Sequence, residues 1–415
     1  MNIISHLLTL IISSLLIIRL LIYFFLSNKN KDFIFRNSSI VPGHFLKYTS
    51  PQDYQNTCNN QIKKNNVDLI FTIYFTLNFV FWTWGGGMRV LDNALSLNSF
   101  LSNSYADLLV KKILFLLIFI TSNLMPYKIK KTIYKIVSNE KKLLLANHIK
   151  ASASELLIQS LLFTIVAFCF VFTLDNVIQI LGPLWPVYLW SSAFLVFIIF
   201  IFLYPNFLSA KSKNGCHNFL DKTHMADSTI NLLKRNQIDQ TQLLVDKTSN
   251  DLYVEAFGFG SNSCIIFKHQ VLELLNVQEI EAVIAHEIGH LKNHHPIKLL
   301  SLVMLFVLVF VLLFGNNYQS NYLFNGLGTP IYLALYILLA PLYIFYVTPI
   351  FCWFTRKFEN DADRFASTQI NTNNLSSAIS KIASKKKNLL IKDHLYGWFF
   401  DKSPNLLSRI DKLKC

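Results

Sequence analysis

The chain has 415 residues, of which 53% are hydrophobic and only 15% are charged. Soluble proteins usually carry about 25% charged residues, so this composition excludes a set of ordinary soluble domains and indicates a multi-pass integral membrane protein. The formal net charge is +14. Lysine-rich cytoplasmic loops explain this basicity better than binding to nucleic acid does, and we expect no nucleic acid partner.

Seven apolar stretches are each long enough to cross about 30 Å of hydrocarbon as a helix. They lie near residues 3–26, 67–88, 108–126, 155–179, 184–205, 298–316 and 329–354. Lysines concentrate in the loops 27–66 and 127–153, whereas the other short loops carry little or no charge. By the positive-inside rule, this alternation predicts an external N-terminus and places 206–297 and 355–415 in the cytoplasm.

Residues 277–295 contain the strongest chemical motif, His-Glu-Ile-Gly-His. Acidic residues lead and basic residues follow in this segment, as the dipole of a helix favours, and Pro296 limits the helix. His286 and His290 are four residues apart, so a helix places both imidazoles on one face, where they can bind one Zn²⁺. Glu287 then points beside the metal, as a general base for the attacking water must.

A catalytic zinc ion needs a third protein ligand. His294 and His295 follow the motif, but we expect both at the membrane interface, because the third histidine of the longer HExxHxxGxxH pattern would fall on a proline. Glu359 and Asp363 are better candidates, since they follow the last span and stand four residues apart. One carboxylate can bind zinc while the other supports a histidine from behind. On spacing alone, a solvent-exposed acidic turn without a role in metal binding is an equally good interpretation of this segment.

These segments predict a mainly α fold with about seven transmembrane helices and a small α+β, zincin-like cytoplasmic domain that the last helical hairpin splits. We expect four parts in chain order. They are 1–205 with helices one to five and their loops, 206–297 with an edge strand and the motif helix, 298–354 with helices six and seven, and 355–415 with the third ligand and the C-terminal segment.

The histidine motif before a membrane hairpin, followed by Glu-Asn-Asp-Ala-Asp after it, resembles the integral-membrane CAAX prenyl endopeptidases and the related HtpX heat-shock proteases. Seven spans favour the prenyl-endopeptidase branch. The resemblance implies that His286, His290 and Glu359 hold one Zn²⁺ per chain. It also implies that Glu287 is the catalytic base and that Asp363 supports the site from behind.

Residues 252–267 resemble the family's edge strand before the zinc helix, along which an extended peptide can pair. Glu255, Ala256 and Phe257 are therefore candidate substrate-binding residues. The family usually has Asn-Ala where this chain has Glu255-Ala256.

Residues 403–410 resemble the family's His-Pro segment, which ends in Arg-Ile or Arg-Leu. Arg409 matches this pattern and is a further candidate for substrate binding, but Ser403 stands where the family usually has histidine. His394 is a candidate replacement that would stabilise the oxyanion.

The sequence thus predicts a zinc endopeptidase at the cytoplasmic face of a membrane, the inner membrane of a bacterium or the endoplasmic reticulum of a eukaryote. Its expected partners are the lipid bilayer and a peptide or protein substrate, prenylated or embedded in the membrane. A catalytically weak zinc-binding scaffold is the alternative, motivated by Glu255 and Ser403. A transporter is disfavoured, because no span carries paired charges.

Overall fold

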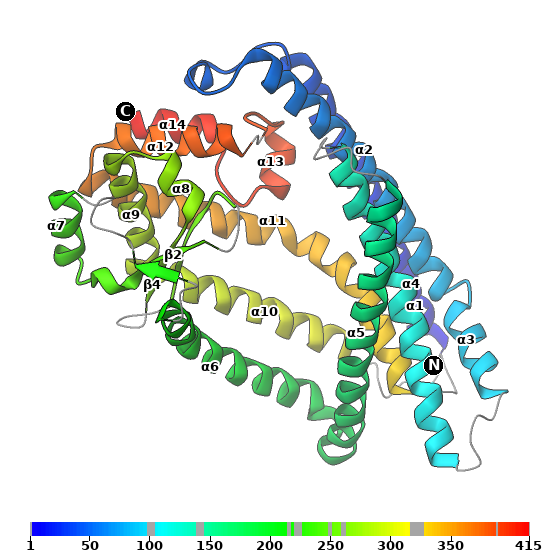
Figure 1. The fold of residues 1–415 in the computed structure, drawn as a ribbon. Helices are drawn as coiled ribbons and strands as arrows, with labels where there is room; N and C mark the ends of the chain where they lie inside the picture. The colour runs from blue at the N-terminus through cyan, green and yellow to red at the C-terminus, as the bar shows by residue number, and fades with distance from the viewer. Residues whose placement is uncertain are drawn as a thin grey trace. The chain divides into compact units, whose positions relative to one another are not determined.

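The computed structural model describes residues 2–97, 104–137, 145–213, 217–219, 226–247, 251–258, 263–315, 328–386 and 389–414. Helices dominate the chain, as its composition predicts (Figure 1). The chain divides into two compact units. The first contains Met1–Asn28, Asn60–Trp190 and Leu308–Tyr346, and the second contains Lys29–Asn59, Ser191–Val307 and Val347–Cys415. The four-part division of the sequence stays a prediction.

The long helices contain the seven apolar stretches. They are α1 (Asn2–Asn37), α2 (Pro51–Trp82), α3 (Gly87–Ser96), α4 (Ser104–Val137), α5 (Leu145–Leu181), α6 (Trp185–Lys213), α10 (His295–Gly315) and α11 (Thr329–Gln369). Among the described residues, five helices are long and apolar enough to cross a membrane, or six if α2 and α3 form one span. The apolar part of α6, Trp185–Ile199, is shorter than these candidate spans. The chain is therefore an integral, multi-pass membrane protein.

The stretch expected as one span at 67–88 is bent by 47° between α2 and α3. Gly86 lies at this break with φ +78°, a left-handed conformation that residues with a Cβ rarely adopt. The hydropathy pattern placed the glycine run 85–87 inside one span. In the structure, this run follows the end of α2 and turns the chain into α3.

Aromatic side chains pack the interior of the first unit. Trp82 of α2 meets Phe119 of α4 edge to face, with ring centroids 5.2 Å apart. Near them, Asn78 donates a hydrogen bond to Asn123 across the same pair of helices at 2.8 Å. An amide pair of this kind satisfies two polar groups that would otherwise face hydrocarbon, and it fixes the register of α2 against α4.

The second unit is built on a small sheet. Its strands are β1 (His217–Phe219), β2 (Leu243–Asp246), β3 (Val254–Phe257) and β4 (Cys264–Lys268), in the order β1-β2-β4-β3. β2 and β4 are parallel, and the other two pairs are antiparallel. The segment expected as a single edge strand thus forms two strands, of which β3 is the edge. No described strand pairs with the free side of β3.

Shorter elements complete the described chain. They are η1 (Gly43–Phe45), η2 (Gly182–Leu184), η4 (Gln240–Gln242), α7 (Asp227–Arg235), α8 (His269–Leu274), α9 (Val277–Lys292), α12 (Thr372–Lys385), α13 (His394–Phe400) and α14 (Leu406–Lys414).

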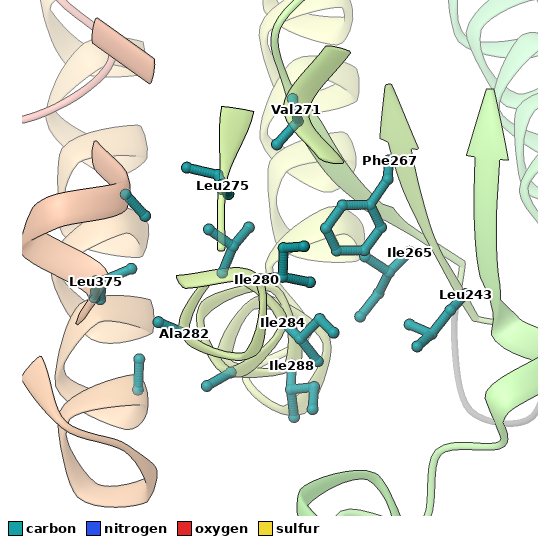
Figure 2. Packing of buried hydrophobic residues seen from close by; sticks show 14 of the residues in the cluster. Leu243, Ile265, Phe267, Val271, Leu275, Ile280, Ala282, Ile284, Ile288 and Leu375 are labelled. Carbon is teal, nitrogen blue, oxygen red and sulfur yellow. The ribbon is translucent and has the colours of Figure 1, made fainter. Parts of the chain in front are cut away.

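Helix α9 lies in the centre of the second unit, between the sheet and α12 (Figure 2). Ile280, Ile284 and Ile288 recur at intervals of four along α9 and face apolar side chains of the sheet, including Ile265 and Phe267. All five side chains are almost completely buried. Each contributes roughly 1.5–3 kcal/mol of burial free energy, so the hydrophobic core fixes the rotation of the helix that carries the histidine motif.

Candidate metal centre

The motif helix α9 begins with a capping box. The Asn276 side chain accepts a hydrogen bond from the backbone N–H of Glu279, and the Glu279 carboxylate accepts one from the backbone N–H of Asn276. The helix ends at Lys292, and His294 has φ 55° before α10 begins at His295. The motif helix therefore does not continue straight into the sixth apolar stretch. A left-handed residue separates the two helices.

His286, His290 and Glu359 converge at one point, which α9 and α11 form together. The Nε2 atoms of the two histidines lie 3.2 Å apart. Glu359 places Oε2 3.7 Å from Nε2 of His286 and Oε1 3.6 Å from Nε2 of His290. Tetrahedral zinc with bonds of about 2.0–2.1 Å separates its ligand atoms by about 3.3 Å. The three side chains thus form a group that can hold a metal ion, and their spacing fits zinc.

Gly289 allows the close approach of the two helices that carry these ligands. A Cβ atom added at this position would lie 3.0 Å from Cα and 3.1 Å from the carbonyl oxygen of Ala362 on α11. Both contacts are with backbone atoms, which cannot move aside as the end of a side chain can. The distance between the histidines and Glu359 therefore depends on the absence of a side chain at Gly289.

Asp363 and Arg409 lie behind the three candidate ligands. Nδ1 of His286 lies 3.0 Å from Oδ1 of Asp363, so this carboxylate faces the ring nitrogen that does not point at the metal position. Arg409 donates to both oxygens of Asp363, at 2.6 and 2.8 Å, and its Nη1 lies 3.0 Å from Oε2 of Glu359. The guanidinium thus holds both carboxylates of α11 in place.

The charges at the site are strongly affected by burial. Burial raises the pKa of Glu287 to about 8, and the Glu359 and Glu255 carboxylates act in the same direction, whereas the His286 ring opposes them. Burial also lowers the pKa of His290 to about 3, with a further contribution from His286. His286 differs: burial lowers its pKa, but Asp363 together with the Glu359 and Glu287 carboxylates outweighs burial, and the net effect is a raised pKa.

A cavity of about 840 Å³ opens beside the centre, within the second unit. Glu287, His290 and Glu359 line it, together with the strand residues 254–258. Its apolar wall comes from α6, α10 and α11, through Phe197, Pro296, Ile297, Leu299, Leu300, Val303 and Phe358. The cavity therefore offers an extended edge strand, a polar centre and a hydrophobic wall within one space.

The structure brings some of the predicted substrate-binding residues to this cavity and leaves others away from it. Glu255, Ala256 and Phe257 line it, whereas Arg409 and His394 do not. Arg409 instead contacts Asp363 and Glu359, as described above. His394 is the first residue of α13.

Three residues of the site were not predicted from the sequence. Lys402 lines the cavity beside Ser403, and Gly289 sets the approach of the helices. His295, expected at the membrane interface, is the first residue of the candidate span His295–Phe314, and it is only 3% exposed and its ring lies beside His290. The position of His295, five residues after His290, was the feature of the sequence that could have indicated this contact. The turn at His294, which brings the ring back to His290, is not evident from spacing.

Comparisons with known proteins agree with this fold. Residues 31–209 match the CAAX prenyl protease N-terminal region with five membrane helices, and residues 223–415 match peptidase family M48. The CAAX prenyl protease 1 homolog of Dictyostelium discoideum is 24% identical over 246 residues, which are 56% of this chain and 56% of that protein. The crystal structure of S. mikatae Ste24p has a similar fold, with a TM-score of 0.74 at 18% identity over 97% of this chain and 98% of that one.

The C-terminal match defines the class, that of the M48 peptidases. The N-terminal match extends the similarity to the membrane helices. The chain belongs to the CAAX prenyl endopeptidase family, which confirms the family predicted from its motifs.

Proposed function

We propose that this protein is a zinc-dependent endopeptidase that cleaves prenylated or membrane-associated substrates at the cytoplasmic face. The observation that carries the proposal is the convergence of His286, His290 and Glu359 at 3.2–3.7 Å beside a buried glutamate. Two imidazoles and one carboxylate are a ligand set that catalytic zinc uses in hydrolases, and they leave one coordination position open. Family membership and the membrane-spanning helices support the same assignment.

Zinc, when bound by these three residues, supplies Lewis acidity to the scissile carbonyl and to the attacking water. Glu287 carries the proton transfers: its carboxylate accepts a proton from the water and later donates it to the leaving amine nitrogen. The group faces the cavity, and its buried position raises its pKa to about 8. A carboxylate that lies beside the metal position is placed to take a proton and to return it.

Asp363 and Arg409 act as positioning residues in this proposal. Asp363 accepts the Nδ1–H of His286 and so keeps its Nε2 directed at the metal position. Arg409 binds Asp363 through two hydrogen bonds and also pairs with Glu359. Fork-like guanidinium contacts restrict both carboxylates in angle as well as distance.

We place the substrate peptide along β3. This strand is at the edge of the sheet and lines the same cavity as Glu287, which supports binding by strand addition. The apolar wall that includes Leu299, Leu300 and Val303 supports a lipidated or membrane-embedded segment as the neighbouring part of the substrate. A prenylated peptide agrees with the name of the Dictyostelium relative, a CAAX prenyl protease 1 homolog.

The membrane arrangement belongs to the same proposal. We retain seven spans in contact with the bilayer, with α2 and α3 as one bent span and α6 as the fifth. The lysine-rich loops support a cytoplasmic position for the α+β, zincin-like domain and its metal centre. The last helical hairpin divides this domain in the sequence.

A catalytically weak, zinc-binding scaffold is the second candidate. Glu255 supports it, because this carboxylate lines the cavity and contributes to the raised pKa of Glu287. Ser403 also lines the cavity, where the family usually has histidine. Such a protein would bind one zinc ion and cleave neither class of substrate.

The test uses the purified full-length chain in lipid nanodiscs, with a prenylated peptide and an unprenylated membrane protein as substrates. We expect cleavage that a chelator removes and added zinc restores. Glu287→Gln keeps the size of the side chain and is the matched control, with at least about a thousandfold loss of cleavage expected. Full cleavage by Glu287→Gln contradicts the assigned base, and zinc binding without any cleavage by the wild type supports the scaffold.

A further inference from the structure

The histidine His295 lies directly behind the second motif histidine. Its Nδ1 is 3.0 Å from Nδ1 of His290. Its ring stacks on Phe358 of α11, with the ring centroids 4.5 Å apart and the planes at 16°. The side chain is therefore held on one side by an aromatic ring and on the other by a candidate ligand. Its position is well defined, and its contact with His290 is polar.

The contact between the two rings restricts where their protons lie. Nε2 of His290 faces Nε2 of His286 and the Glu359 carboxylate, so this nitrogen is the one that points at the metal position. A neutral imidazole that binds a metal through Nε2 carries its proton on Nδ1. That Nδ1–H points at Nδ1 of His295, which must then be unprotonated and accept the hydrogen bond.

We propose that His295 is a positioning residue for the metal centre, which accepts a hydrogen bond from Nδ1 of His290 and thereby fixes the tautomer and the angle of that ligand. This inference rests on the proposed zinc site. It gives the two histidines different supports. Asp363 supports His286 with a carboxylate, and a neutral imidazole supports His290. A neutral acceptor orients a ligand without adding another negative charge to a centre that already contains Glu287, Glu359 and Asp363.

Two other roles for His295 lead to different expectations. A fourth ligand would have to reach the point between His286 and Glu359, but His295 faces the opposite nitrogen of the His290 ring. A ring that only fills space between α10 and α11 would affect stability and leave the affinity for zinc unchanged. Zinc affinity, measured separately from stability, therefore distinguishes positioning from packing.

The experiment compares His295→Phe, which keeps a ring against Phe358 without an acceptor, with His295→Asn, whose side-chain oxygen can replace Nδ1. The neighbouring His294 is exposed and provides the matched control as His294→Asn, since asparagine tolerates its positive φ. Each full-length protein is purified and stripped of metal. The zinc dissociation constant is measured by competition with a chelator, and thermal unfolding of the metal-free protein is measured in parallel.

We expect His295→Phe to bind zinc about 10–100-fold more weakly than wild type, as loss of a hydrogen-bond partner behind a ligand usually causes. His295→Asn should recover most of this loss, and His294→Asn should bind like wild type. Equal affinity of His295→Phe and wild type overturns the inference. If the phenylalanine variant does not fold, His295→Gln takes its place, because its amide reaches the position of Nε2 and not that of Nδ1. In that case, a zinc affinity of His295→Gln equal to that of His295→Asn overturns the inference. Failure of the wild type to bind zinc instead rejects the proposed function.

Discussion

Replacing Gly289 by alanine tests whether the spacing of α9 and α11 sets the metal centre. The added Cβ would lie 3.0–3.1 Å from two backbone atoms of Ala362 and from Cβ of Phe365. These contacts are tighter than real Cβ contacts usually are, so α9 must move by a few tenths of an ångström. Overpacking of this kind costs about 1–3 kcal/mol, while alanine gains about 1 kcal/mol in helix propensity. We expect a net loss of stability of about 1 kcal/mol.

The same movement should have a larger effect on zinc. His286 and His290 lie on α9 and Glu359 lies on α11, so separating the helices moves ligands apart. Zinc–ligand distances are held within about 0.2 Å, and the expected displacement exceeds this tolerance. We therefore expect Gly289→Ala to bind zinc at least about tenfold more weakly and to cleave more slowly, as measured by chelator competition and peptide cleavage.

Gly397→Ala is the matched control for this variant. It makes the same change on α13 of the same unit, where the added Cβ meets only the side-chain end of Asp401, at 3.2 Å. We expect wild-type zinc affinity in this control. Unchanged zinc affinity in Gly289→Ala would refute the reasoning that the close helix contact sets the ligand geometry.

Three further changes test other parts of the account. Burial raises the pKa of Glu287 from 4.5 to about 8, so in the metal-free protein its contribution to stability is complete below about pH 4.5 and is lost as the pH rises to about 8. Glu287→Gln should flatten this fall in melting temperature. Lys381→Met removes the cation that lies 2.7 Å from the buried carboxylate of Glu279, and we expect it to lower the free energy of unfolding by about 1–3 kcal/mol. The double variant with Glu279→Gln should recover part of this loss. Arg409→Lys should lower kcat more than it raises KM, because one ammonium cannot replace the two hydrogen bonds to Asp363.

The sequence predicted the helical fold and the family well, because both depend on local patterns. Apolar stretches of membrane length identify long helices without any knowledge of their packing. The spacing of His286 and His290 fixes their common face as soon as a helix is assumed. The bend after α2 was missed, because hydropathy averages over the glycines near Gly86 and does not register their backbone conformation.

The support of the site could not be predicted in the same way. Arg409 lies far from Asp363 in the chain, and only tertiary packing brings the two together. The contact of His295 with His290 was not predicted, because the sequence does not reveal the left-handed turn at His294 that returns its ring to His290. Gly289 reads as an unfavourable helix residue until the close approach of α11 is known.

The central claim is that His286, His290 and Glu359 together hold one zinc ion. Its most direct test is the zinc content and zinc affinity of the wild type, Glu287→Gln and Glu359→Gln, after removal of metal and titration with zinc. We predict one zinc ion per chain with similar affinity in the first two proteins, and affinity at least about a hundredfold weaker in Glu359→Gln, which loses a charged ligand. Zinc bound equally tightly by Glu359→Gln would contradict the account.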